Sequence, residues 1–490
     1  MEHLSELEVR RQKLDQLREQ GIEPYPYRFD VSRSFAQIRE QYEEKLESGE
    51  RSEDSYRLAG RITGWRGKGK MTFLDLRDAS GRLQAMVTVN NLGEEAYAQL
   101  KLLDLGDIVG ISGQIAKTKM GELSIAATEI VLLSKSLRPL PEKYHGLTDV
   151  DLRYRQRYLD LIVNPEVKET FKIRSQILNM IRSYLTERGF MEVETPMLHP
   201  IAGGAAARPF KTHHNALDME LYLRIAPELY LKRLIVGGFD RVFELNRNFR
   251  NEGMSTRHNP EFTMLELYQA YADYTDMINL TEDLVSNLVQ AIHGTDTITY
   301  QGQEVSFARP WKRMTMLEAV CEYAGCQPSD FDSLEAAHAA AARAKVEVEK
   351  DTPIGKVLND IFESVDSQLI QPTFITNYPR EVSPLAKVHR DNPALTERFE
   401  FFITGREFGN AFSELNDPID QKERFEAQLA AHAAGDEEAH AMDHDYVLAL
   451  EHGMPPAGGL GIGIDRLVML LTDSASIRDV LLFPHMRPHA

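Results

Sequence analysis

The chain has 490 residues, a length above that of a usual single domain, so we expect two domains with separate hydrophobic cores. Its composition, 42% hydrophobic and 27% charged, is typical of a globular protein in water. The sequence contains no apolar run long enough to span a membrane and no secretory core at its N-terminus, so we expect a cytoplasmic protein. The formal charge of −19 argues against a general nucleic-acid binder, and Cys321 and Cys326 predict reduced thiols rather than a disulfide scaffold or a zinc site.

A run of short strands follows two helical segments at 4–20 and 34–47. The strands are expected at 56–65, 71–77, 81–89, 107–117 and 122–133, with a helical piece at 92–103. Five strands with a helix between the third and the fourth are typical of the OB-fold barrel. Four basic residues cluster here without an acidic residue between them: Arg61, Arg66, Lys68 and Lys70. A local basic surface that binds nucleic acid is therefore compatible with the acidic charge of the whole chain.

Alternation along the second and third strands puts Phe73 and Gln84 on the polar face of this barrel, away from its leucines. OB folds bind single-stranded nucleic acid on these strands, where a ring can stack on a base and an amide can bond base edges. An isolated surface aromatic explains Phe73 equally well on this evidence.

A proline-stiffened connector at 138–146 marks the expected boundary between domains 1–145 and 146–490. The second domain opens with a helix and a short strand over 165–197. Residues 295–375 are expected to form a helical insertion, to which we assign no chemistry.

Small residues at 202–207 suit a mobile loop where backbone approaches a ligand. Pro227 would begin a helix with Glu228 in its first turn. A glutamate in that position also commonly just complements the helix dipole.

Residues 241–271 predict two antiparallel strands joined by a polar loop at 253–260. Alternation puts Arg250 and Glu252 on one side at the end of the first strand. The second strand presents an equal-parity set on one face: Phe262, Glu266 and Tyr268. A ring, an arginine and several carboxylates would therefore share a surface, although a solvated sheet face would explain either strand alone.

Residues 397–414 predict a hairpin that turns at Thr404 and Gly405. Glu400 and Glu407 lie on opposite arms near the turn, where two carboxylates could share a magnesium ion on a triphosphate. Further along, three residues of equal parity can face one pocket: Asn410, Phe412 and Glu414. Solvent exposure is the default alternative for each glutamate individually.

The glycine-rich segment 458–463 lacks the spacing and the βαβ context of a dinucleotide-binding loop. It predicts instead a strand that lets a ligand lie against bare backbone, with Arg466 at the start of the next helix.

The stretch Phe249-Arg250-Asn251-Glu252, with Arg257 to Phe262 after a short loop, resembles the second signature motif of class II aminoacyl-tRNA synthetases. Residues 165–197 resemble the first motif and residues 458–467 the third. The likeness runs over almost the full chain, which closely resembles lysyl-tRNA synthetases of bacterial type. It implies an α+β protein: an N-terminal OB-fold barrel that binds the anticodon, followed by a class II catalytic domain with an antiparallel sheet flanked by helices. It also implies a homodimer through residues 165–197.

The resemblance implies that the chain joins lysine to tRNA(Lys) in two steps. ATP and lysine would first give lysyl-adenylate and pyrophosphate, with Mg²⁺ bound alongside ATP as the cofactor. The 3′-hydroxyl of the terminal ribose of the tRNA would then take the lysine.

The same resemblance implies the site residues. Arg250 and Arg466 would be catalytic, contacting the α- and γ-phosphates of ATP. The ATP set would add Glu252, His258, Asn259 and Phe262, with Glu400 and Glu407 also holding the metal. The lysine set would be Gly204, Glu228, Arg250, Glu266, Tyr268, Asn410, Phe412 and Glu414. The anticodon set would be Phe73, Gln84 and Glu122.

The charge of the pocket residues distinguishes a site for lysine from a site for aspartate. A pocket for aspartate must present cations to the side-chain carboxylate, whereas a pocket for lysine must pair a desolvated ammonium that has only donors. The expected pocket is rich in acidic acceptors, which favours lysine. We assign Glu266 and Glu414 to the ε-ammonium and Glu228 to the α-amino group.

Three alternatives are kept. A class II enzyme for aspartate or asparagine is the closest. A noncatalytic RNA-binding scaffold would leave Arg250, Phe262 and Arg466 with no reason to coexist. A lysine-modifying relative that does not charge tRNA would lack the N-terminal barrel.

Overall fold

The computed structural model describes residues 5–141, 147–205, 207–433 and 442–488. The chain divides into two compact units, Met1–Thr148 and Asp149–Ala490. The last part of the expected connector, residues 142–146, lies outside the described residues. None of the described helices is both long and apolar enough to span a membrane.

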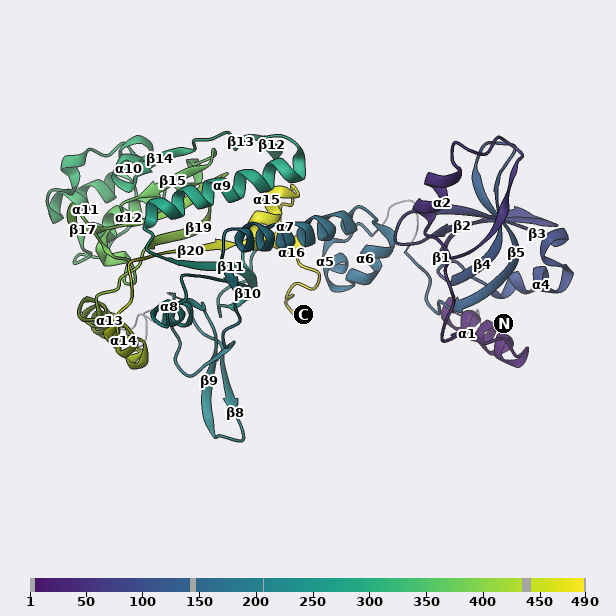
Figure 1. The fold of residues 1–490 in the computed structure, drawn as a ribbon, viewed down its shortest axis with the longest axis horizontal. Helices are drawn as coiled ribbons and strands as arrows, with labels where there is room; N and C mark the ends of the chain where they lie inside the picture. The colour runs from purple at the N-terminus through teal and green to yellow at the C-terminus, as the bar shows by residue number, and fades with distance from the viewer. Residues whose placement is uncertain (1–4, 142–146, 206, 434–441, 489–490) are drawn as a thin grey trace. The chain divides into compact units, whose positions relative to one another are not determined.

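The first unit is a closed five-stranded barrel with the strand order β1-β2-β3-β5-β4 (Figure 1). Its strands are β1 (Arg51–Lys68), β2 (Met71–Arg77), β3 (Arg82–Thr88), β4 (Ile108–Lys117) and β5 (Leu123–Ser134). Its helices are α1 (Glu6–Glu19), α2 (Phe35–Tyr42), α3 (Val89–Leu92) and α4 (Glu94–Gln99). The last two helices lie between β3 and β4, so the OB-fold prediction is confirmed. Inward residues such as Leu58, Leu74 and Ile111 are fully buried, as alternation requires.

An eight-stranded sheet forms the centre of the second unit, with the order β14-β15-β18-β19-β20-β11-β10-β6. The strands are β6 (Met191–Glu192), β10 (Arg241–Phe249), β11 (Glu261–Ala270), β14 (Lys312–Thr315), β15 (Thr373–Thr376), β18 (Arg398–Ile403), β19 (Arg406–Ser413) and β20 (Ala457–Gly463). Apart from the edge pairs β6-β10 and β14-β15, the pairing is antiparallel, as expected.

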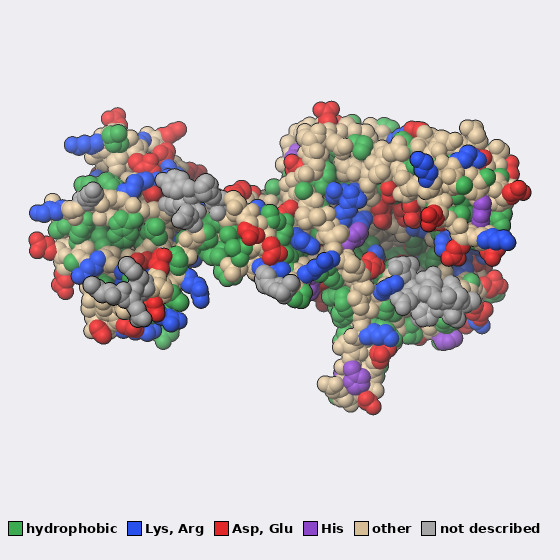
Figure 2. Space-filling model, turned by 180° about the vertical axis from the view of Figure 1, so that it is seen from behind, with side chains coloured by type: hydrophobic (Ala, Val, Ile, Leu, Met, Phe, Trp, Pro, Cys, Tyr) green, Lys and Arg blue, Asp and Glu red, His purple; other side chains and the backbone are tan. Residues whose placement is uncertain are grey.

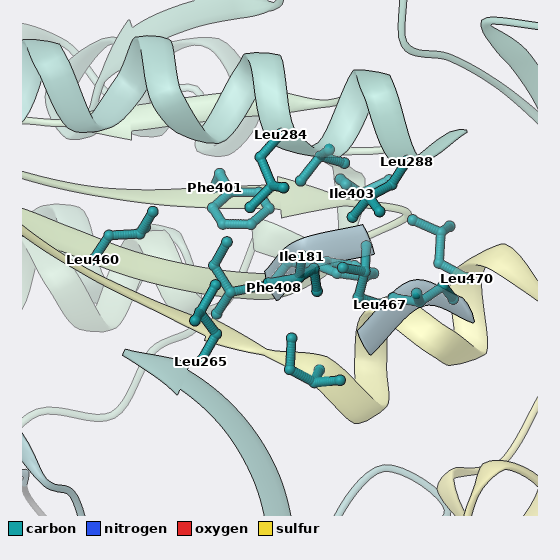
Figure 3. Close-up of a cluster of buried hydrophobic side chains, with 14 of the residues drawn as sticks. Ile181, Leu265, Leu284, Leu288, Phe401, Ile403, Phe408, Leu460, Leu467 and Leu470 are labelled. Carbon is teal, nitrogen blue, oxygen red and sulfur yellow. The ribbon is translucent and has the colours of Figure 1, made fainter. Parts of the chain in front are cut away.

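One face of this sheet packs against α7 (Val167–Glu187), α9 (Tyr274–His293) and α15 (Ile464–Leu471). Figure 3 shows Leu284 and Leu288 of α9 above strand residues such as Phe401. Burial of these apolar side chains is the main stabilising contribution on this face. The cluster holds the strands that carry the site in a fixed register.

Helices pack on the opposite face at its two ends. At one end lie α8 (Glu228–Val236), α13 (Pro418–Ala433) and α14 (His444–Glu451), which pack on Tyr268 and Phe412. At the other end lie α10 (Met316–Ala324), α11 (Leu334–Arg343) and α12 (Ile354–Glu363), which pack on Ile375 and Phe402. The middle of this face carries the candidate site.

Shorter elements complete the second unit. They are α5 (Val150–Arg155), α6 (Arg157–Val163), α16 (Ile477–Val480), β7 (Leu198–His199), β8 (Lys211–His214), β9 (Met219–Leu223), β12 (Thr297–Tyr300), β13 (Gln303–Ser306), β16 (Val388–His389) and β17 (Asn392–Thr396). Strands β7, β9 and β8 form a small sheet of their own.

Residues 295–375 are not the purely helical insertion that the sequence predicts. They begin with the hairpin β12-β13, and β14 and β15 form one edge of the central sheet. Both edge strands have only four residues and pair in parallel across about 60 intervening positions, so local periodicity does not reveal them. Trp311 stacks on Phe374 with ring centroids 5.3 Å apart, which ties this edge to the core.

Candidate active site

The middle of the sheet, between these two groups of helices, holds two adjoining cavities. Arg250, Met264 and Glu407 line both, so together they form one cleft. Figure 2 shows acidic side chains gathered at a hollow in this unit. The cleft is lined by residues from β11, β18, β19 and β20, by the loop that follows β10 and by the starts of α8 and α15.

The first cavity has a basic and aromatic lining. The Arg250 guanidinium lies 5.2 Å from the centroid of the Phe262 ring, and its buried Nε has no hydrogen-bond partner among the described residues. Such a donor is available to an anion in the cavity. Strand β10 ends at Phe249, so Arg250 and Glu252 follow the strand instead of lying on it. One further hydrogen bond, from the Arg250 N–H to the Pro260 carbonyl at 2.9 Å, continues the β10–β11 pairing past the end of the strand and so holds the Arg250 backbone in place.

Arg466 enters the same cavity from the first turn of α15, as the glycine-rich strand predicts. Its Nη1 donates to the Glu407 carbonyl at 2.6 Å, and its Nη2 lies 3.4 Å from Nε2 of His258. Burial and the nearby Arg466 charge lower the pKa of His258, so its imidazole is neutral at pH 7. Arginines with a neutral imidazole suit the oxygens of a polyphosphate.

The remaining predicted ATP residues also line this cavity. Glu252 lies at its exposed rim. The Asn259 side chain donates to the Glu261 carbonyl at 2.6 Å and accepts from the His485 N–H at 3.2 Å. The Asn259 side chain therefore braces the loop between β10 and β11.

A β-bulge brings Glu400 and Glu407 to the same side of their hairpin. Phe401 pairs with Gly409 and Phe402 with Glu407, which leaves Phe408 as the extra residue. Glu407 thus faces the cleft although its parity differs from that of Asn410, which pairs with Glu400. The turn is at Thr404 and Gly405, both with positive φ.

Glu400 is tightly held within this pair of carboxylates. It accepts from the Tyr378 hydroxyl at 2.9 Å and from Nη2 of Arg398 at 2.6 Å. Burial and repulsion by Glu407 raise its pKa to about 7. The described residues contain no cluster of three or more His, Cys, Asp or Glu side chains that could hold a metal. Two carboxylates still fit Mg²⁺, which keeps waters and takes phosphate oxygens as its other ligands.

The second cavity is lined by three buried carboxylates, those of Glu228, Glu266 and Glu414. Burial, reinforced by the Glu228 charge, raises the pKa of Glu266 to about 8. Its Oε2 is 3.5 Å from the Tyr268 hydroxyl, a long hydrogen bond. Oε1 of Glu414 has no hydrogen-bond partner among the described residues. Unsatisfied buried acceptors of this kind favour a cationic ligand with several N–H donors.

The other residues predicted for lysine lie in this cavity too. Gly204 has φ +90°, a conformation that favours glycine, and lines the wall beside Glu228. Asn410 accepts from Nε of Arg398 at 2.9 Å, and Phe412 lines the cavity and packs in the same apolar cluster as Tyr268.

Two site residues escaped the sequence interpretation, Lys232 and Arg398. Nζ of Lys232 lies 2.6 Å from Oε1 of Glu228 and is ion-paired with Glu414. In the sequence, Glu228 and Lys232 look like a surface pair at i,i+4, which is the commoner meaning of that spacing. Arg398 contacts both Glu400 and Asn410. The one sequence signal for its position is that it lies two residues before Glu400, so that both side chains project from the same face of the strand.

The glycines of β20 leave space for side chains from the two neighbouring strands. A Cβ on Gly459 would lie 1.9 Å from Oε1 of Glu414 and 2.6 Å from the Tyr268 ring. Bare backbone is needed here to accommodate these protein side chains, in addition to any ligand.

The candidate nucleic-acid residues lie on adjacent strands of the barrel, in the other unit. Phe73 is half-buried on β2, Glu122 is partly exposed just before β5, and Gln84 is buried on β3. The Ser124 hydroxyl donates to the Gln84 side-chain oxygen at 2.9 Å, so Gln84 has an internal partner as well. Arg66 and Arg82 both pair with Asp75, which reduces the net positive charge of this surface.

Comparisons with known proteins agree with this geometry. Residues 149–487 match a family model described as tRNA synthetases class II (D, K and N), and residues 56–133 match one described as OB-fold nucleic acid binding domain. A protein of Carboxydothermus hydrogenoformans named lysine–tRNA ligase is 58% identical over 492 residues, covering 100% of both chains. Proteins of the same name from Moorella thermoacetica and Bacillus cereus are 59% and 56% identical, each covering 98% of this chain and 97% of the relative.

The close packing at Gly459 predicts that Gly459→Ala destabilises the protein. The added methyl group must displace Glu414 or the Tyr268 ring, and overpacking of this kind costs about 1–3 kcal/mol. Gly463→Ala is the matched control on the same strand, because its Cβ would meet no atom closer than 3.7 Å. We expect urea unfolding to show a lower midpoint for Gly459→Ala alone; equal midpoints would contradict the packing.

Proposed function

The chain belongs to the class II tRNA synthetases of the aspartate, lysine and asparagine group, and from that premise we propose that its cleft activates lysine with ATP and transfers it to tRNA. The observation that supports lysine within this group is the cavity with three buried glutamates. Arg250 lies where this cavity meets the first one, and the other two nearby cations, Lys232 and Arg398, are already paired with carboxylates, so acidic acceptors outnumber the available cations. Full-length similarity to proteins named lysine–tRNA ligase supports the same assignment.

In the first step, the lysine carboxylate attacks the α-phosphorus of ATP in line and pyrophosphate leaves. The carboxylate is ionised at neutral pH, so the protein must position it and neutralise charge; a general base is not needed. Arg250 is suited to the α-phosphate because it lines both cavities, at the place where the two substrates would meet.

The rest of ATP would occupy the first cavity. Phe262 would stack on adenine and Glu252 would receive its amino group. Arg466, with the neutral His258 beside it, would bind the γ-phosphate. Asn259 would hold the loop that carries these residues.

Glu400 and Glu407 would hold Mg²⁺ bound with the triphosphate, where the ion would neutralise phosphate charge. Arg398 and Tyr378 orient Glu400 for this role through two hydrogen bonds. Because the pKa of Glu400 is about 7, its carboxyl group must lose a proton at neutral pH before it can serve as a ligand.

The second cavity would take lysine with its carboxylate toward Arg250. Glu228 would bind the α-amino group beside Gly204, and Glu266 and Glu414 the ε-ammonium, with Tyr268 as a supporting partner. Asn410 and Phe412 would complete the wall around the side chain.

The second step needs the tRNA. The 3′-hydroxyl of its terminal ribose would attack the adenylate, while Phe73, Gln84 and Glu122 of the barrel would contact the anticodon. We also propose a cytoplasmic homodimer in which residues 165–197 contact a second copy; Met191, a large apolar residue of this region, is exposed in the single chain.

Arg250→Ala tests the nucleotide assignment. Loss of a cation at the developing α-phosphate charge should lower lysine-dependent exchange of pyrophosphate into ATP by roughly 10²–10³-fold. Arg247→Ala, which removes a partly exposed arginine on the same strand outside the cleft, is the control and should stay near normal. Near-normal exchange by folded Arg250→Ala would exclude the proposed role.

Phe73→Ala tests the RNA assignment. Loss of one stacked base should weaken charging of tRNA(Lys) by an amount equivalent to about 1–3 kcal/mol, while tRNA-independent lysine activation stays unchanged. Tyr27→Ala removes a fully exposed aromatic from the same unit and should affect neither assay. Equal losses in both assays for Phe73→Ala would indicate a folding defect and exclude specific anticodon stacking.

A further inference from the structure

Lys232 is fully buried below the carboxylates of the second cavity. It lies on α8, one turn after Glu228, and its Nζ donates to Oε1 of Glu228 at 2.6 Å. The same Nζ is ion-paired with Glu414, which directly follows β19 far along the chain. The aromatic rings of Phe412 and Tyr268 lie 5.3 and 6.0 Å from this nitrogen and close off its surroundings.

A buried lysine is rare and requires partners. Burial lowers the pKa of Lys232, but the charges of Glu228 and Glu414 outweigh that effect and raise it above its ordinary value. Burial likewise raises the pKa of both glutamates, and the Lys232 ammonium opposes that rise. Lys232 is therefore a permanent cation that favours ionised Glu228 and Glu414.

The net charge of the three glutamates and Lys232 matches the two ammonium groups of a lysine ligand. The three glutamates can supply three negative charges, and Lys232 neutralises one of them. Two remain, and lysine carries two ammonium groups. Two acceptors are not taken up by Lys232: Oε1 of Glu414, which has no hydrogen-bond partner among the described residues, and the Glu266 carboxylate, which accepts only long hydrogen bonds of 3.5 Å from Asn248 and Tyr268 in the described part of the chain. An amino acid with a single ammonium would leave one of these buried carboxylates without a cation, so that group would either stay protonated or carry an unpaired charge, and it would add little to binding.

We propose that Lys232 is a specificity-determining positioning residue: its ammonium holds Glu228 and Glu414 in place and sets the charge of the pocket to match the two ammonium groups of lysine. This inference rests on the proposed function and deepens it. Lys232 acts through the two glutamates and does not itself contact the reacting atoms.

Replacing Lys232 separates its charge from its bulk. Lys232→Met keeps most of the methylene chain and removes the charge, so we expect the KM for lysine in the exchange assay to rise roughly a hundredfold or more. The KM for ATP should stay within about twofold, because ATP would occupy the first cavity. The ATP value also reports whether the variant is folded.

Lys232→Ala allows a sharper test by chemical rescue. This change removes the atoms of a propylammonium group, so added propylammonium should restore lysine-dependent exchange with a saturable dose dependence. Propanol, similar in size but uncharged, should not restore it. The unaltered protein is the control for direct competition of propylammonium with lysine.

The outcomes are distinguishable. An unchanged KM for lysine in Lys232→Met overturns the inference, as does equal rescue by propanol or no rescue by propylammonium. A raised lysine KM with amine-specific rescue supports it. Absence of lysine-dependent exchange in the unaltered protein would instead contradict the proposed function.

Discussion

The cost of keeping carboxylates away from water is the constraint on which the cleft depends. Glu228, Glu266 and Glu414 come from three separate segments of the chain, and their side chains are buried around one cavity, where an unpaired charge would be strongly destabilising. Lys232 offsets part of this cost from below, and the bare backbone of Gly459 leaves room for Glu414 and Tyr268. Lys232 does not neutralise the remaining negative charge of the three glutamates. A cationic ligand would neutralise it and so stabilise the cavity.

Opposite charges at the two ends of the cleft would orient a bound amino acid. Arginines line the end proposed for ATP, and glutamates line the end proposed for the amino acid. A cationic amino acid would therefore enter with its ammonium groups toward the glutamates and its carboxylate toward Arg250. This orientation aims the carboxylate at the α-phosphate before any chemistry occurs, which is the entropic contribution that positioning makes to catalysis.

Local pattern in the sequence predicts much of this arrangement. The barrel strands, the two long strands β10 and β11, and the common face of Phe262, Glu266 and Tyr268 all follow from period-two alternation. The bulge at Phe408, which turns Glu407 into the cleft, does not, because parity arguments assume regular pairing. Lys232 was missed for a related reason: a helical Glu and Lys at i,i+4 reveal nothing about burial until α8 packs against β11 and β19.

Proton release on lysine binding tests most directly whether the buried carboxylates hold the ligand ammonium. In the empty pocket the pKa of Glu266 is about 8, so the group carries a proton at pH 7. A bound ammonium favours the ionised form and lowers that pKa, so the proton must leave and affinity must rise with pH up to about 8. Titration calorimetry with lysine in buffers of different ionisation enthalpy should show a release approaching about one proton near pH 7. Binding without proton release between about pH 6.5 and 7.5 would contradict this arrangement of charges.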